Sequence, residues 1–447
     1  ALMAQFVGIQ FLTLKLGTAI CGLLMLPYVY LLGKEIGNKR VGLYAVFFAS
    51  IAYWPNVIAR VGLRYILYAA FAAPVLYYLY RGLKRQHRND FIMAGIFLGI
   101  GLHGYSSFRF IPIVVGTVAV IYWLHNLKDQ KKIQTAIYSV LIIGLVSLVI
   151  FLPLMRYWLQ NPEMFSYRMA TRLGQAEQSY PENPILIFFK NTWRALTMFF
   201  HDNGEVWVHS VTHRPALDLI TAGIYFIGCL VLVLDYFKKR SWEYLSLMVS
   251  IPLLLMPSIL SLAFPAENPC LNRTSAAMIP VFVIAGFGME TLMISMRRKF
   301  GTPGGAKFVI VLIVLLLLAS AGLNYDLVFY QYADQFVRGA WNTSDIGQVI
   351  EEFANSFGSY DTAYVIPFPH WVDTRLVGIN AGAPRKDFAL SQEFIPDTLP
   401  QEGSKLFIFK YDDNATMDQL TTLYPEGKLK FYNDQYEGKD FYIFIVP

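Results

Sequence analysis

Residues 16–42 read LGTAICGLLMLPYVYLLGKEIGNKRVG. An apolar run of this length crosses a hydrocarbon core of roughly 30 Å as a helix, and the basic residues that follow it favour a short cytoplasmic turn. The same alternation of apolar run and short connection repeats along the chain. It predicts about ten membrane-spanning helices, at residues 12–33, 41–59, 65–81, 91–106, 110–124, 134–155, 217–236, 244–263, 275–296 and 307–323.

The short connections after the first, third, fifth, seventh and ninth expected spans are basic. Lysine and arginine hold short loops in the cytoplasm, so the other connections, the C-terminal segment and residue 1 are expected outside. Because an outer N-terminus normally follows a signal or a span, we expect at least one helix and an outer loop before Ala1. The basic residues are Lys34, Lys39, Arg40, Arg81, Lys84, Arg85, Arg88, Lys128, Lys131, Lys132, Lys238, Lys239, Arg240, Arg297, Arg298, Lys299 and Lys307.

The composition is that of a polytopic membrane protein, because 55% of the 447 residues are hydrophobic and the mean hydropathy is +0.42. The net charge of +6 hides a division of the chain: residues 324–447 carry 9 basic and 18 acidic side chains. The excess of basic charge therefore lies in short loops beside the spans. That placement is explained by topology and argues against nucleic acid as a partner.

We expect an all-α polytopic membrane domain at residues 1–323, followed by a small extracytoplasmic α/β domain at 324–447. The membrane domain contains a long outer loop at 156–216, in which residues 185–200 read as an amphipathic helix on the outer leaflet. The acidic C-terminal domain has the alternation of a soluble protein. Its helices are expected at 341–357 and 416–424, and its strands at 363–367, 375–380, 405–411, 428–432 and 441–446.

Several polar side chains lie at the outer ends of expected spans. The preference of basic residues for the cytoplasmic side does not explain the arginines among them. These side chains are Arg60, Arg64, Tyr105, Arg109 and Arg273. Arg60 and Arg64 are four residues apart and would share one helix face, and Tyr105 and Arg109 repeat this spacing. A guanidinium suits a phosphate, so the set predicts a site for a lipid-linked phosphate at headgroup depth. For each arginine alone, the alternative is snorkelling to ordinary headgroups or a structural ion pair.

Other polar residues of the outer connections are weaker candidates. His201, Asp202 and Glu205, with His209 and His213 of the same loop, are the residue types that bind a divalent metal or act as a general base, but their spacing matches no closed metal motif and favours a solvated loop. Glu267 either contacts substrate or pairs with the nearby arginine of its turn. His103 either lines a cavity or is an interface histidine. The sequence requires no cofactor, and a divalent metal stays open.

Four runs of the chain resemble bacterial GT-C superfamily glycosyltransferases, in the branch of the protein O-mannosyltransferases and aminoarabinose transferases. These runs are residues 16–42, 50–64, 104–112 and 268–280, and the similarity covers about residues 12–300. The resemblance implies a multi-pass enzyme of the bacterial plasma membrane. Such an enzyme moves a sugar from a polyprenyl-phosphate donor to an acceptor hydroxyl of a protein, glycan or lipid on the outer face.

The resemblance also bears on the catalytic residue. In that family the catalytic acid lies in the first outer loop, and this chain begins after the equivalent position. The catalytic residue is therefore expected upstream of Ala1, and none is assigned within the chain. The residues at the outer ends of the spans would contact the donor phosphate or line the substrate cavity. This substrate-binding set is Arg60, Arg64, His103, Tyr105, Arg109, Glu267 and Arg273.

Two other classes of function stay open. A non-catalytic membrane subunit could scaffold a larger assembly, and a chain without the catalytic loop favours that alternative. A transporter or flippase of lipid-linked substrates would also span the membrane many times. Transporters of that kind carry broken, charged helices at the bilayer midplane, whereas the expected spans here are nearly free of ionisable side chains at mid-membrane.

Overall fold

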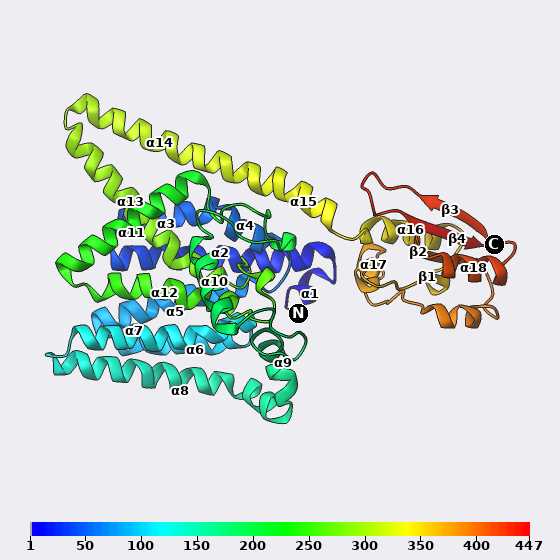
Figure 1. The fold of residues 1–447 in the computed structure, drawn as a ribbon, viewed down its shortest axis with the longest axis horizontal. Coiled ribbons are helices and arrows are strands. Elements are labelled where there is room, and N and C mark those ends of the chain that lie inside the picture. The colour runs from blue at the N-terminus through cyan, green and yellow to red at the C-terminus, as the bar shows by residue number, and fades with distance from the viewer. Residues whose placement is uncertain (1) are drawn as a thin grey trace. The chain divides into compact units, whose positions relative to one another are not determined.

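A computed structural model describes residues 2–447 of the chain (Figure 1). The chain divides into two compact units, of which one is Gly17–Gln335 and the other contains Phe336–Pro447. The first unit is built from apolar helices that run side by side. The helices of residues 2–339 are α1 (Leu2–Val7), α2 (Phe11–Ile36), α3 (Lys39–Ile51), α4 (Tyr53–Arg60), α5 (Ile66–Arg85), α6 (Arg88–Leu102), α7 (Ile111–His125), α8 (Gln130–Gln160), α9 (Pro162–Leu173), α10 (Pro184–Thr197), α11 (Leu219–Lys239), α12 (Trp242–Ile259), α13 (Met278–Lys299), α14 (Pro303–Asp326) and α15 (Tyr332–Gly339).

The expected count of ten spans is not confirmed. In the described part of the chain, eight helices are long and apolar enough to cross a membrane, and the pair α3 and α4, bent by 51°, makes a ninth. Each of the ten expected stretches falls on a helix or on such a pair. However, α6 has 15 residues and is about 22 Å long, which is shorter than a hydrocarbon core. The helix ends at Leu102, four residues before the end of the expected stretch, and the apolar run does not reveal that end.

The basic turns of the first unit gather at one end of the helices. At the end of α5, Arg85 lies 2.5 Å from Glu35 of α2, and Arg40 of α3 lies 3.5 Å from Glu290 of α13. Trp242 at the start of α12 stacks on Tyr80 of α5, with ring centroids 5.4 Å apart. The turns that the charge pattern assigns to one side of the membrane are therefore neighbours in space.

Helices α11 and α13 approach each other through two glycines. A Cβ on Gly288 would lie 2.1 Å from the carbonyl oxygen of Ile224, and a Cβ on Gly228 would lie 2.1 Å from that of Ile284. No side chain fits there, so the two backbones are in direct contact. This contact fixes the position of α11, which begins at the end of the unit opposite the basic turns.

Gly288→Ala is therefore expected to destabilise the folded protein by about 1–3 kcal/mol, because the methyl group forces the two helices apart. The measurement is the midpoint of unfolding of the purified protein in mixed micelles. Gly116→Ala in α7 is the matched control, since a Cβ there meets nothing within 4 Å. Equal midpoints for the two variants would contradict the close contact.

The second unit contains a four-stranded sheet in the order β1 (Ala363–Val365), β2 (Lys405–Lys410), β4 (Phe441–Val446), β3 (Lys428–Tyr432). Strands β1 and β2 are parallel and the other pairs are antiparallel. Helices α16 (Thr343–Ser356) and α17 (Thr374–Asn380) cover one face, where Ile350, Val377 and Ile408 share a core. Helix α18 (Asn414–Leu423) covers the other face through Leu420, which packs on Phe407. The expected α/β domain is confirmed.

One expected element of this unit is wrong. Residues 375–380 were expected as a strand, and they form α17. Asp373 accepts a hydrogen bond from the backbone N–H of Arg375 at 2.9 Å and caps the helix. Val377 and Ala381, the residue that follows the helix, are both buried and are four apart, which is a helical spacing. The window 375–380 does not contain Ala381, and its β-branched residues favour a strand.

Candidate functional site

The loops at the opposite end of the first unit, away from the basic turns, form one assembly. The ring of Tyr65, just before α5, packs against the rings of Tyr105 and His209 at 5.3 and 5.6 Å between centroids. Trp54 of α4 donates its indole N–H to the carbonyl oxygen of Leu271 at 3.0 Å. Four connections that are far apart in the sequence therefore meet at this end, which the charge pattern predicts to be the outer one.

Two arginines and one glutamate lie in this assembly. Arg273 donates to the carboxylate of Glu267 and to the hydroxyl of Ser261. Arg172 of α9 lies 3.2 Å from the other carboxylate oxygen of Glu267 and covers the ring of Phe264 at 4.1 Å. The cluster carries one more positive than negative charge. The predicted pairing of Glu267 with Arg273 is present in it.

His209 is buried within the same assembly. Its Nε2 lies 3.6 Å from the sulfur of Cys270, and its side chain is about 1% exposed. Burial, together with the charge of Arg273, lowers the pKa of His209 from 6.5 to about 3. The imidazole is therefore neutral in the folded protein over the physiological pH range.

This histidine makes the stability depend on pH. Between pH 6.5 and about 3 the unfolded chain binds a proton at His209 and the folded chain does not, so acidification favours unfolding. The contribution is a loss of up to about 1.4 kcal/mol for each pH unit. His209→Gln is expected to flatten the fall of the unfolding midpoint between pH 6.5 and 5. The matched control is His201→Gln, because His201 is exposed; a slope unchanged by His209→Gln would contradict the burial of a neutral imidazole.

An apolar groove of about 670 Å³ lies beside the start of α11. Its walls include Leu219 and Phe226, whose side chains are largely exposed as expected for residues that face lipid. Arg214 is the charged residue of the lining, and burial lowers the pKa of its guanidinium. Within the described residues it forms no ion pair; its Nε donates to the carbonyl oxygen of Pro215 at 3.1 Å, and its guanidinium covers the ring of Tyr53 at 4.9 Å.

Arg60 and Arg64 do not share a helix face, which corrects one expectation. Helix α4 ends at Arg60, and Gly62 has a φ of +79°, so the helix cannot continue to Arg64. Arg60 lies over the ring of Phe329 at 4.5 Å. Arg64 is exposed and has no ion pair with any residue of the described chain. Their roles as phosphate contacts stay predictions.

The other predicted residues have protein partners. Arg109 donates to the carbonyl oxygen of Phe165 at 3.2 Å and covers its ring at 3.7 Å, so it attaches α9 to the outer end of α7. His103 shares a 3.0 Å hydrogen bond with the carbonyl oxygen of Ile150 in α8. Tyr105 is buried against Tyr65 and belongs to the assembly described above.

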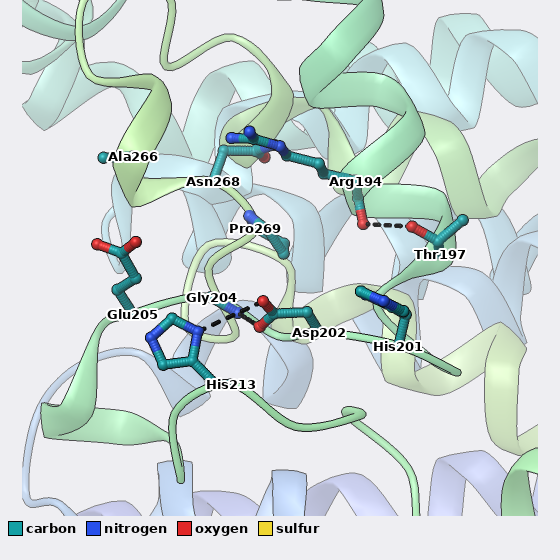
Figure 2. A pocket seen from close by; sticks show the side chains of 10 residues that line it. All are labelled: Arg194, Thr197, His201, Asp202, Gly204, Glu205, His213, Ala266, Asn268 and Pro269. Carbon is teal, nitrogen blue, oxygen red and sulfur yellow. Dashed lines mark hydrogen bonds and ion pairs between the residues drawn. The ribbon is translucent and has the colours of Figure 1, made fainter.

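The three weak metal candidates line a polar cavity of about 220 Å³ (Figure 2). Asp202 accepts a backbone hydrogen bond from Gly204 at 2.8 Å and lies 3.4 Å from Nδ1 of His213. His201 and Glu205 point in from other sides. Among residues 2–447, as far as their side chains are described, no group of three or more histidine, cysteine or acidic side chains is arranged to hold a metal ion.

A buried acid anchors the outer end of α14. Asp218 caps α11 by accepting from the backbone N–H groups of Ile220 and Thr221. It also accepts from the hydroxyl of Ser320 at 3.1 Å and from the amide of Asn324 at 2.8 Å. Asn324 in turn accepts from the backbone N–H of Tyr53 at 2.7 Å. Helices α11, α14 and α4 are thereby joined by one polar network.

Sequence reasoning missed Arg172 and Arg214. Both lie in the outer loop 156–216, which contains several charged residues of similar appearance. Arg214 could have been found, since it stands four residues before Asp218 and the start of α11 and so meets the criterion applied to the other outer arginines. Arg172 carries no such signal, because only the fold brings α9 against the turn of Glu267.

Comparison with known proteins finds others with a similar sequence segment or a similar fold. Residues 1–158 match the family described as dolichyl-phosphate-mannose-protein mannosyltransferases. The crystal structure of ArnT from Cupriavidus metallidurans, in the apo state, has 12% sequence identity and a TM-score of 0.58, covering 99% of this chain and 85% of ArnT. The structure of the same protein bound to undecaprenyl phosphate gives the same TM-score and identity and covers 86% of ArnT.

A second solved structure extends the comparison. The archaeal oligosaccharyltransferase AglB from Archaeoglobus fulgidus, in complex with an inhibitory peptide and a dolichol-phosphate, has 14% identity and a TM-score of 0.54, covering 96% of this chain and 63% of AglB. No curated protein matches the chain by sequence. The chain therefore has the fold of ArnT, over 99% of its own length, and of AglB, which is the fold that the resemblance to GT-C glycosyltransferases implied.

Proposed function

We propose that the protein is a glycosyltransferase that moves a sugar from a polyprenyl-phosphate donor to an acceptor hydroxyl on the outer face of the membrane. The fold supports the general class, since both ArnT and AglB carry it. The particular reaction rests on the groove at the start of α11. The membrane is the bacterial plasma membrane in this proposal, and the C-terminal domain lies outside it.

The proposal rests on one observation: the half-buried arginine Arg214 lies in the lining of an apolar groove. A polyprenyl phosphate has an apolar chain and an anionic head, and the groove offers lipid-facing walls with Arg214 among them. A guanidinium that is partly desolvated and has no carboxylate in ion-pair contact attracts a phosphate more strongly than a solvated one does. Undecaprenyl phosphate and dolichol-phosphate are bound in the ArnT and AglB structures, which supports the same class of ligand here.

Further cations support the binding of an anion at this end. Arg60 covers Phe329, which follows the C-terminal end of α14, and it remains exposed enough to reach a headgroup. The cluster of Arg172, Glu267 and Arg273 adds a net positive charge to the same end of the unit. In this proposal Arg214 binds the donor phosphate directly, and the other arginines raise the local concentration of anionic donor.

The chemistry needs two groups besides the sugar. An acceptor oxygen attacks the anomeric carbon while the bond from that carbon to the phosphate oxygen breaks, and the phosphate leaves with the electron pair. Arg214 stabilises the charge that develops on this leaving group. A general base takes the proton of the acceptor, and we assign it to no residue of this chain.

The test uses the natural full-length protein in lipid nanodiscs. Radiolabelled polyprenyl-phosphate sugars are supplied with mixed acceptors, and the release of free polyprenyl phosphate is measured together with labelled product. We expect release with at least one donor and competition by undecaprenyl phosphate. Polyprenol without phosphate is the control ligand and should not compete. If undecaprenyl phosphate neither binds nor competes, the proposal is wrong.

A further inference from the structure

We propose that the polar cavity beside Pro269 binds a sugar-sized, hydroxyl-rich acceptor group. This inference rests on the proposed transferase and identifies the site and chemical class of its second substrate. The cavity volume of about 220 Å³ corresponds to roughly seven water molecules at about 30 Å³ each. That space accommodates one sugar residue and is much smaller than the groove beside α11.

The walls of the cavity present hydrogen-bonding groups that the protein leaves unused. Arg194 of α10, His201 and Glu205 line it, and none of the three side chains has a hydrogen bond or ion pair with another residue of the described chain. Figure 2 shows them approaching from different sides. Donors and acceptors distributed around one small space are what a ring of hydroxyl groups requires.

The opposite wall is held in place. Asp202 is fixed by the backbone N–H of Gly204, and its second oxygen lies 3.4 Å from Nδ1 of His213. His213 has a φ of +56°, a conformation that residues other than glycine rarely adopt. The surrounding loop therefore determines where this imidazole lies, and the wall is ready for a ligand before it arrives.

The balance of charge separates this cavity from the donor site. Arg194 is opposed by two carboxylates, Asp202 and Glu205, so the acidic side chains of the lining outnumber its one arginine. A phosphate is disfavoured there and neutral hydroxyl groups are not. Ala266 and Pro269 are its apolar lining residues, which is too little apolar wall for a prenyl chain.

Two consecutive residues of the chain line the cavity and the donor groove, one each. His213 lines the cavity and Arg214 lines the groove, and their Cα atoms are about 3.8 Å apart across one peptide bond. Backbone hydrogen bonds from Asn203 to the Arg214 carbonyl oxygen, 2.8 Å, and from His213 to the Gly204 carbonyl oxygen, 3.2 Å, fix this pair. The cavity and the groove therefore share one hydrogen-bonded stretch of backbone.

The kinetic test compares Glu205→Gln and Arg194→Gln with Lys190→Gln in the full-length protein. Lys190 is on the same helix as Arg194, pairs with Glu182 at 2.5 Å and lies outside the cavity. The two cavity variants are expected to raise the KM for a saccharide acceptor by roughly ten- to hundredfold, because each removes a charged hydrogen-bonding group. An unchanged acceptor KM in the double variant overturns the inference.

A binding test keeps this inference separate from the proposed reaction. Ala266→Cys and Lys190→Cys proteins are labelled with a maleimide in the presence of methyl α-mannoside or of a serine-containing peptide; Ala266 lines the cavity without supplying a charged group. We expect the saccharide to slow labelling of Ala266→Cys and not of Lys190→Cys. Protection by the peptide alone overturns the assignment to a saccharide, and protection by neither overturns the site. If the saccharide protects but the donor-release test fails, the proposed function is wrong and this site stays in place.

Discussion

Arg214→Gln is expected to lower sugar transfer from a polyprenyl-phosphate donor by roughly 100- to 1000-fold. Glutamine keeps some hydrogen bonding and removes the charge that stabilises the departing phosphate. Because the guanidinium is partly desolvated, its attraction to an anion is weakly screened, and no carboxylate within ion-pair distance shares it in the described chain. Most of the loss should appear in kcat, since charge on the phosphate oxygen grows as the bond to the sugar breaks.

The measurement is initial-rate kinetics in nanodiscs at a fixed phospholipid composition. Arg214→Lys should recover part of the rate, because an ammonium keeps the charge without the two-pronged geometry of a guanidinium. Arg156→Gln is the matched control: this arginine is at the outer end of α8, is exposed and has no ion pair with a described residue. Equal rates for Arg214→Gln and Arg156→Gln would show that the groove is not part of the donor site.

Asp218→Ala is expected to destabilise the protein by about 2–4 kcal/mol. The change removes the cap of α11, worth about 1 kcal/mol, and leaves the buried side chains of Ser320 and Asn324 without their acceptor. Helix α14 has little apolar packing to compensate, since only 17% of its span is buried. The loss should be seen as a lower unfolding midpoint and as earlier proteolysis in the connection before α15.

The control for this variant is Asp129→Ala. Asp129 caps α8 through the backbone N–H groups of Lys131 and Lys132, but 46% of its side chain is exposed and it joins no buried network. It should lose only the cap, about 1 kcal/mol. If both aspartates cost the same, the links to Ser320 and Asn324 carry no stability, and α14 is held by other contacts.

The sequence predicts the fold well because lipid imposes a simple rule. Every stretch expected as a span falls on a helix, since an apolar run in a membrane must satisfy its backbone hydrogen bonds internally. The errors are local. The break at Ala52, where ψ is 140°, and the early end of α6 at Leu102 are not visible in the apolar pattern. Residues 375–380 gave a strand pattern because a short window cannot separate a helix from a strand.

The site is predicted less completely. Glu267 and Arg273 are near in sequence, so their pairing is visible before the fold is known. Arg172 reaches Glu267 from a helix about a hundred residues earlier, and no periodicity reports such a contact. Arg109 was selected because it is a basic residue at an outer end of a span, where the cytoplasmic bias does not explain it. In the structure its guanidinium contacts the carbonyl oxygen and the ring of Phe165. Charge and position in the sequence identify candidate arginines. Only the packed structure shows which of them already has a protein partner and which is available to a ligand.

The backbone pairing of residues 203–204 with 213–214 has an energetic consequence for the two substrates. This short ladder contains both His213, which lines the cavity, and Arg214, which lines the groove. Gly204 of the ladder is so close to Pro269 that a Cβ on it would lie 2.2 Å from the Pro269 carbonyl oxygen. A ligand that shifts this ladder from either side changes the affinity on the other side, and thermodynamic linkage makes the two changes equal. The donor and the acceptor are then cooperative ligands of a single loop.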